Sequence, residues 1–285
     1  LAQYLQNEQL AVVSELAQKT LLLPSLSPAQ RQNVQIILAN AYFDQTQWQA
    51  AEQAYRQVLA LPNLPAEMTT RYQNQLAASL YKQADQAQQQ GNAELAARLY
   101  LQASQATVDD KLKVDAAWRS AMVIGEIQAA IVPLQGFYRD YPSQPQAVGI
   151  PERIVTIQEK LQDWQGAAKT YQQIMQRDLN SNPSNALAAL WLAAESERKA
   201  RMATQKTVAT AAELALYQQY ITQPNADFAQ SIEASERIYQ AAVSNNDQTA
   251  RLAEQQRQIA FAQRPNLPAA LKPRLDFMLS RALTE

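Results

Sequence analysis

Two distant segments of this chain follow the same order of large and small side chains. They are Trp48-Gln-Ala-Ala51-Glu-Gln-Ala-Tyr55-Arg-Gln-Val58 and Trp164-Gln-Gly-Ala167-Ala-Lys-Thr-Tyr171-Gln-Gln-Ile174. Each places an aromatic, a small, an aromatic and a β-branched residue at positions i, i+3, i+7 and i+10, which is one face of an α-helix. A fold built from copies of one helical unit is the first inference. Repetition at helical-hairpin length is typical of a solenoid, and a solenoid usually binds rather than catalyses.

Residues 33–61 have the pattern of a helical hairpin. Leu38, Ala39 and Tyr42 form the apolar stripe of a first helix, Thr46-Gln47 makes a short turn, and Pro62 stops the second helix. The same frame fits three more times along the chain. Its four central alanines are Ala51, Ala96, Ala130 and Ala167.

Leu-Ala-x-x-Tyr, followed by Trp-x-x-Ala-x-x-x-Tyr-x-x-Val and a closing proline, resembles a tetratricopeptide repeat. Four copies, over about residues 33–175, carry the resemblance. It implies an all-α fold, a right-handed α-solenoid of tetratricopeptide-like helical hairpins. We expect residues 1–180 to form the regular superhelix, and residues 181–285 to continue it with degenerate repeats and a C-terminal helix.

Prolines mark the joints between the predicted hairpins. Pro62-Asn-Leu-Pro65 and Pro265-Asn-Leu-Pro268 are near copies, each followed by an alanine that suits the first turn of a new helix. The recurring joint favours one continuous superhelix over two unrelated domains. Pro133 is an exception because it falls inside a predicted second helix, where its missing N–H should produce a kink.

Composition narrows the range of functions. The 285 residues include no histidine and no cysteine, so the usual general base, the usual nucleophiles and most zinc ligand sets are missing. We therefore expect no catalytic residues, no metal site and no cofactor. The 25 basic residues are dispersed among 26 acidic ones, which disfavours nucleic acid as a ligand. No apolar stretch approaches the roughly 18 to 20 residues that span a bilayer, so no direct membrane insertion is expected.

Charged and aromatic clusters have structural interpretations. Asp109-Asp110 precedes a predicted helix and is expected to cap it rather than to bind a metal. The aromatic stripes of the two repeated segments are predicted to be core packing rather than a ligand platform. A mixed charge run in the C-terminal half is predicted to be a solvated helix face; it comprises Glu195, Glu197, Arg198, Lys199 and Arg201.

The family resemblance also implies where a ligand binds, since its groove is lined by exposed first-helix positions on the concave side. These positions are Asn33, Asn40 and Asp44 in the first copy, Tyr81 and Asp85 in the second, Arg119 in the third, and Glu152 and Thr156 in the fourth. Such a surface could clamp an extended peptide, with Asn40 as the best-matched position. The alternative is that these residues are merely solvated.

The leading functional hypothesis is a non-enzymatic scaffold for protein or peptide partners within a bacterial envelope assembly, secretion or polysaccharide-export complex. Two alternatives remain open: the superhelical region of a larger peptidoglycan-processing enzyme whose catalytic domain lies outside this chain, and self-association through the solenoid ends. The glutamine-rich, cysteine-free composition favours a periplasmic setting over the cytoplasm. A start at Leu1 rather than methionine is expected of a processed protein or of an excerpt from a longer one.

Overall fold

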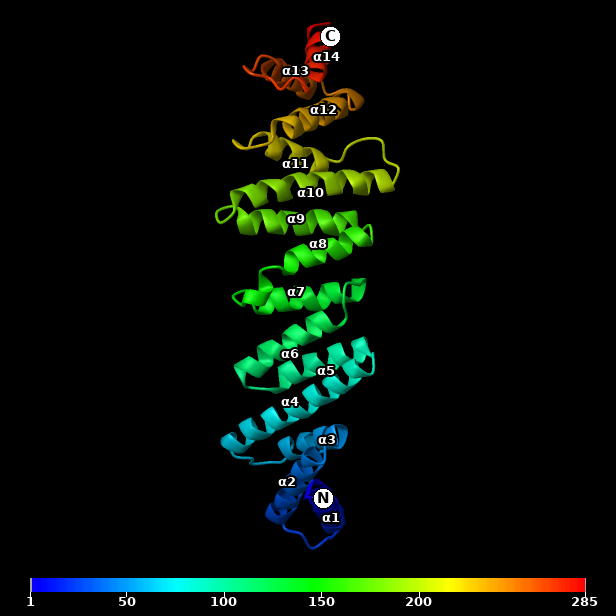
Figure 1. Ribbon diagram of the computed structural model, residues 1–285, viewed down its shortest axis with the longest axis vertical. Helices are drawn as coiled ribbons and strands as arrows, with labels where there is room; N and C mark the ends of the chain where they lie inside the picture. Colours follow the sequence, from blue (N-terminus) through cyan, green and yellow to red (C-terminus); the bar gives the residue numbers. More distant parts are fainter. Residues whose placement is uncertain (1, 285) are drawn as a thin grey trace. The chain divides into compact units, whose positions relative to one another are not determined.

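The computed structural model describes residues 2–284. Within this range the fold is entirely helical, with fourteen α-helices, two short 3₁₀ helices and no strand. The chain divides into two compact units, Leu1–Val148 and Gly149–Glu285, and inside each unit every helix packs against the next (Figure 1). The expected all-α class and the packing of consecutive helices are confirmed, while the handedness of a solenoid stays a prediction.

The first unit holds seven α-helices of the described chain. They are α1 (Ala2–Leu21), α2 (Pro28–Asp44), α3 (Trp48–Leu59), α4 (Ala66–Gln89), α5 (Ala93–Ala106), α6 (Asp110–Val123) and α7 (Ile131–Asp140), with the 3₁₀ helices η1 (Gln128–Ala130) and η2 (Pro145–Ala147) around α7. The pairs α2–α3 and α4–α5 are the first two predicted hairpins.

The second unit holds the remaining seven. They are α8 (Ile150–Lys160), α9 (Trp164–Asp178), α10 (Pro183–Ala203), α11 (Ala211–Ile221), α12 (Phe228–Ser244), α13 (Gln248–Ala262) and α14 (Lys272–Thr284). The division into units falls between residues 148 and 149, whereas the sequence places the change from regular to degenerate repeats near residue 180. The two boundaries describe different properties, compactness and repeat regularity.

Four hairpin turns share one backbone design. A residue in the left-handed region ends the first helix, at Thr46, Gly91, Gln162 and Asn246, with φ of 58, 78, 58 and 54°. The N–H of the following residue bonds back across the turn, as Asp163 does to the Gln158 carbonyl at 2.8 Å. This is the geometry that closes a helix C-terminus. Outside Gly91 the left-handed residue costs about 1 to 2 kcal/mol, so the recurrence of the turn reflects the packing of the helices it joins.

The two proline joints have the same backbone turn, but the helices that follow them begin at different distances from it. Asn63 and Asn266, at equivalent positions, both have positive φ, 61 and 57°. Behind the first joint α4 begins at Ala66, as expected, but behind the second α14 begins at Lys272 rather than at residue 269. Pro273 explains the delay, because a residue without an N–H is tolerated only in the first turn of a helix.

The kink expected at Pro133 does not occur. The α-helix begins at Ile131, after the 3₁₀ turn η1, so Pro133 lies in the first turn of α7 rather than in its interior. A backbone N–H at that position would have no partner within the helix. The prediction was wrong because the sequence alone started this helix too early.

Small and capping residues have their expected roles. The four central alanines of the repeat frame are fully buried. Tyr55, with none of its surface exposed, packs in the same core as Ala51 and Ala96. Asp109 is the N-cap of α6, where its carboxylate accepts from the Leu112 N–H at 2.8 Å, and Asp110 lies in the first turn. The predicted cap is therefore confirmed.

Candidate functional site

Three of the predicted groove residues meet in the first unit. Tyr81 and Asp85 project from α4, and Arg119 projects from α6, two helices that each begin a predicted hairpin. With Tyr100 from α5 and Asp115 from α6 they form a set that we name the Arg119 cluster. Positions that the sequence assigned to separate repeats thus lie within one group of contacts.

Arg119 contacts both Asp115 and the Tyr81 ring within the Arg119 cluster. Its Nε donates to the Asp115 carboxylate at 3.0 Å, and its guanidinium lies 5.3 Å from the centre of the Tyr81 ring. The Tyr81 hydroxyl donates to the same Asp115 carboxylate, and the Tyr100 hydroxyl donates to Asp85 at 2.6 Å. The Arg119 and Asp115 side chains are nonetheless about half exposed, at 47% and 49%. About half of each of these two charged side chains is therefore accessible from solvent.

The two tyrosines stay protonated in this setting. Burial first, and then the hydrogen bond to Asp85, raises the pKa of Tyr100 to about 12. Burial and the Asp115 carboxylate also raise the pKa of Tyr81 above its ordinary value. Both hydroxyls therefore remain hydrogen-bond donors, and the Arg119 cluster presents two aromatic rings, one cation and two carboxylates on neighbouring helices.

The groove residues of the first copy do not join the Arg119 cluster. Asn40, the best-matched clamp position, accepts a hydrogen bond from the buried Tyr55 hydroxyl at 2.9 Å. Its carbonyl oxygen is thus engaged in joining α2 to α3. Asn33 and Asp44 are exposed on α2.

Glu152 and Thr156 belong to the second unit, on α8. The Glu152 carboxylate accepts from Arg177 of α9 at 3.1 Å, and the Thr156 hydroxyl donates to the Glu152 main-chain carbonyl at 2.8 Å. Both side chains thus have a partner nearby: Glu152 ties α8 to α9, and Thr156 bonds within its own helix.

A second cluster was missed by the sequence reasoning. In the second unit Arg237 of α12 donates to Glu195 of α10, to Glu233 of α12 and to the Tyr217 hydroxyl of α11. Its guanidinium also lies 5.7 Å from the centre of the Trp191 ring. We name these five residues the Arg237 cluster. Its Glu195 and Arg237 side chains are 15% and 21% exposed, and its Glu233 side chain is 37% exposed.

The prediction of a solvated face for the charge run on α10 was therefore wrong at its main positions. Glu195 lies in the Arg237 cluster, where it also accepts from Arg198 at 2.9 Å, and Arg201 pairs with the buried Glu213 at 2.7 Å. Lys199 alone fits the expectation of exposure, although its ammonium rests 4.4 Å from the Trp164 ring centre. The sequence of α10 alone predicts a solvated face because the partners of Glu195 and Arg201 lie on other helices, α11 and α12.

A sequence signal for the Arg237 cluster exists. Both clusters contain residues in the same order. An aromatic residue is followed four residues later by a carboxylate, then comes a tyrosine, and then a carboxylate is followed four residues later by an arginine. Tyr81, Asp85, Tyr100, Asp115 and Arg119 follow this order in the first unit, and Trp191, Glu195, Tyr217, Glu233 and Arg237 follow it in the second. Searching for a second copy of the complete order would have found the Arg237 cluster.

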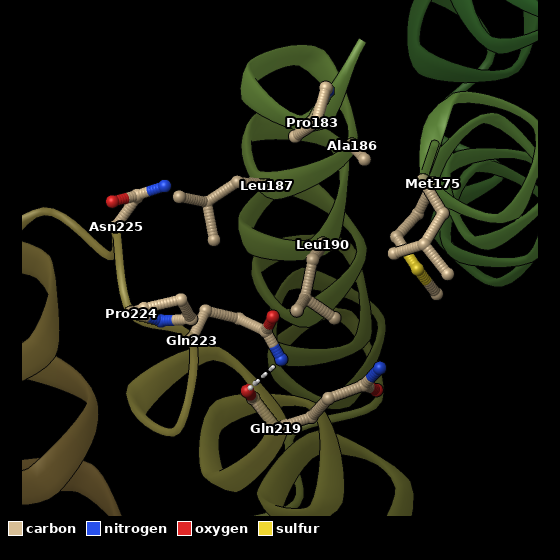
Figure 2. A pocket seen from close by; sticks show the side chains of 10 residues that line it. Met175, Pro183, Ala186, Leu187, Leu190, Gln219, Gln223, Pro224 and Asn225 are labelled. Atoms are coloured by element: carbon tan, nitrogen blue, oxygen red, sulfur yellow. Dashed lines mark hydrogen bonds between the residues drawn. The ribbon is translucent and has the colours of Figure 1, made fainter. Parts of the chain in front are cut away.

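The second unit also contains a small apolar pocket, shown in Figure 2. Its volume is about 150 Å³, and its walls include Met175 of α9 with Leu187 and Leu190 of α10. Gln219 and Gln223 stand at one side, where the Gln223 amide donates to the Gln219 carbonyl at 3.1 Å. No charged side chain lines the pocket in the part of the chain that the structure describes.

Among the side chains of residues 9–283, no three of histidine, cysteine, aspartate or glutamate gather where they could hold a metal ion. Within the same range, no helix combines the length and the apolar character needed to cross a membrane.

Comparison with known proteins adds little to this description. No family model matches the chain, and no curated protein matches it. Among solved structures, the chain aligns with the crystal structure of BtubC (BKLC) from P. vanneervenii at 14% identity, over 94% of this chain and 95% of that chain. The TM-score is 0.24, and a likeness at this level carries no argument about fold or function.

Proposed function

We propose that this chain is a non-enzymatic, tetratricopeptide-like scaffold, a right-handed solenoid that binds a protein or peptide partner. Its support is the repeat frame in the sequence and the recurrence of one turn design at Thr46, Gly91, Gln162 and Asn246. The step from repeats to protein binding is an analogy between folds.

The observation that carries the proposal is the exposure of the Arg119 cluster. Tyrosine and arginine are enriched among the residues that dominate binding energy at protein interfaces. Here Arg119 and Asp115 are held in place by Tyr81 while about half of each side chain remains open. A preorganised guanidinium loses little conformational freedom when a partner carboxylate or main-chain carbonyl replaces water.

The test is crosslinking pull-down from native cells, followed by direct binding of the purified partner. Arg119→Ala is expected to weaken that binding about tenfold or more, because it removes a charged hydrogen-bond donor from the surface. Arg56→Ala is a matched control, since Arg56 also makes an i,i+4 pair at 3.0 Å and is about half exposed, but on the second helix α3. Equal loss in both variants would place the binding elsewhere, and the recovery of no partner would refute the scaffold.

The setting that we propose is the bacterial envelope, and its support is the glutamine-rich, cysteine-free composition alone. Fractionation of native cells with antibodies against the chain tests this separately. Recovery in the cytoplasmic fraction would contradict the envelope setting and leave the scaffold proposal intact.

A further inference from the structure

A groove in the first unit lies apart from the Arg119 cluster. It runs between α5 and α7, with α6 as its floor, and its volume is about 730 Å³. Helix α6 packs closely on α5 and only sparingly on α7, its neighbours along the chain (Figure 1). Leu101 on one wall and Val132 on the other are 47% and 74% exposed.

We propose that this groove binds an amphipathic α-helix of a partner protein, with an apolar stripe against Leu101 and Val132 and a carboxylate against Lys113. The inference rests on the proposed scaffold function, which it deepens by naming a second surface and the chemistry of its occupant. It differs from the Arg119 cluster in its walls, which come from the second helices α5 and α7, and none of its lining residues belongs to that cluster.

The shape of the groove selects a helix. Lys113, Ala117 and Ser120 line the floor at spacing i, i+4, i+7, and the wall residues on α5 and α7 follow the same helical spacing. A stripe of this length covers about two turns, or roughly 10 Å. The floor residues Ala117 and Ser120 are only 8% and 4% exposed, so a docked helix gains most of its contacts from the exposed wall residues Leu101 and Val132.

The polarity of the groove also selects a helix over an extended strand. The Ser104 hydroxyl donates to the Leu101 carbonyl, and the Ser120 hydroxyl donates to the Ala97 carbonyl, both at 2.7 Å. The walls are helices whose main-chain groups already bond one another. An extended peptide would find few partners for its own N–H and C=O groups here, whereas a helix satisfies these groups internally.

The charged residues that line the groove indicate which side chain a partner helix presents to it. Arg139 at the groove pairs with Asp140 at 2.7 Å, so these two charges compensate each other. Lys113 has no carboxylate within 4 Å among the described side chains, and it is half-buried. A partner helix that brings a glutamate or aspartate to Lys113 supplies the missing counter-charge, which favours it over a neutral or basic helix.

A substitution at Gly136 can fill the groove without a clash in the protein itself. It lines the wall on α7, and a Cβ added there would meet no atom within 4 Å. Gly136→Leu fills the groove, and Gly136→Ala is the matched control that adds a methyl group to the same position. Both substitutions favour the helix, since glycine is the poorer helix former.

The experiment selects binders to the full-length chain from a displayed library of 15-residue amphipathic helices with randomised charged positions. We expect acidic, apolar-striped helices whose affinity falls about tenfold or more with Gly136→Leu or Lys113→Glu, and not with Gly136→Ala. Lys111→Glu, a charge reversal of the exposed lysine two residues earlier on α6, should leave binding nearly unchanged. Hydrogen exchange of α5–α7 confirms that each variant is folded.

Three outcomes would overturn the proposal: no helix is selected, the selected helices carry no acidic preference, or their binding is unaffected by Gly136→Leu. Helices that are lost with Arg119→Ala but retained with Gly136→Leu would place binding on the Arg119 cluster. That result would refute the groove and leave the scaffold function standing. The recovery of no native partner in pull-down would instead refute the scaffold itself.

Discussion

The Arg119 and Arg237 clusters contain the same arrangement of side chains in different surroundings. In each, an arginine lies against two aromatic rings and bonds a carboxylate one turn earlier on its own helix. In each, a tyrosine from the preceding second helix donates to a carboxylate on the previous first helix, at 2.6 Å in both cases. What differs is exposure, 47% for the Arg119 side chain and 21% for that of Arg237.

Exposure changes what the same groups do. Around Arg237, burial alone would raise the pKa of Glu195, but hydrogen bonds from Tyr217, Arg198 and Arg237 hold it below its ordinary value. A desolvated carboxylate depends on its cations, so the loss of one leaves an uncompensated charge. Around Arg119, water can replace a lost partner at small cost. We therefore expect the Arg237 cluster to stabilise the fold, whereas the more exposed Arg119 cluster is the surface that we propose for binding.

The largest difference is expected from removing each arginine while keeping its aliphatic length. Arg237→Met should lower the free energy of unfolding of α10–α12 by about 3 kcal/mol, because Glu195 then stays desolvated without its main cation. Hydrogen exchange of α11 amides measures this locally and does not require the two units to unfold together. A loss below about 1 kcal/mol, the range of exposed pairs, would contradict a stabilising role for the cluster.

Removing one tyrosine hydroxyl from each cluster also compares the buried with the exposed cluster, with smaller expected changes in the free energy of unfolding. Tyr217→Phe should cost about 2 kcal/mol, since its hydroxyl donates to Glu195 and accepts from Arg237, and bonds to charged groups are the stronger ones. Tyr100→Phe should cost about 1 kcal/mol, because Asp85 can turn to water and to Lys82. Urea midpoints, with hydrogen exchange to assign them to a unit, check the order. The reverse order would show that exposure does not separate the clusters.

Acid should affect the second unit through Glu195. A carboxylate whose pKa is lower in the folded state contributes stability above its ordinary pKa of 4.5, and this stability is lost as the pH falls below that value. We expect α10–α12 to lose protection between about pH 5 and 3, and Glu195→Gln to lose less over the same interval. A Glu195→Gln variant with the same acid sensitivity as the wild type would show that other carboxylates cause the loss.

Much of the fold follows from local sequence. Helix positions come from 3.6-residue periodicity, and their ends come from prolines and from capping residues such as Asp109. The twin Pro-Asn-Leu-Pro joints predicted the same local backbone, and Asn63 and Asn266 share it. The predicted starts of two helices were wrong because each of these helices begins next to a proline. Pro133 lies in the first turn of α7, and Pro273 lies in the first turn of α14.

The candidate sites were less predictable because they depend on neighbours distant in sequence. Tyr81, Asp85 and Arg119 were found through the repeat frame, which relates one hairpin to the next. Glu195 was misread because its charge partner Arg237 is 42 residues away, and no local pattern reports burial at that distance. Asn40 stays a predicted ligand position, and the sequence did not indicate that its carbonyl oxygen accepts a hydrogen bond from the Tyr55 hydroxyl. Repeat position predicts which face a residue occupies, but only packing decides whether its polar atoms are free.

Arg119→Met is expected to change the free energy of unfolding the least. It therefore gives the most direct test of the difference between the two clusters. Its pair with Asp115 is an exposed i,i+4 pair, for which about 0.3 to 0.5 kcal/mol is usual, and the methionine still covers the Tyr81 ring. Hydrogen exchange of α4–α6 should change little, while partner binding should fall as with Arg119→Ala. A loss of stability as large as that of Arg237→Met would mean that Arg119 locks α4 to α6. A partner would then have to break a stabilising contact in order to bind there, and the exposed cluster would no longer be a favourable interface.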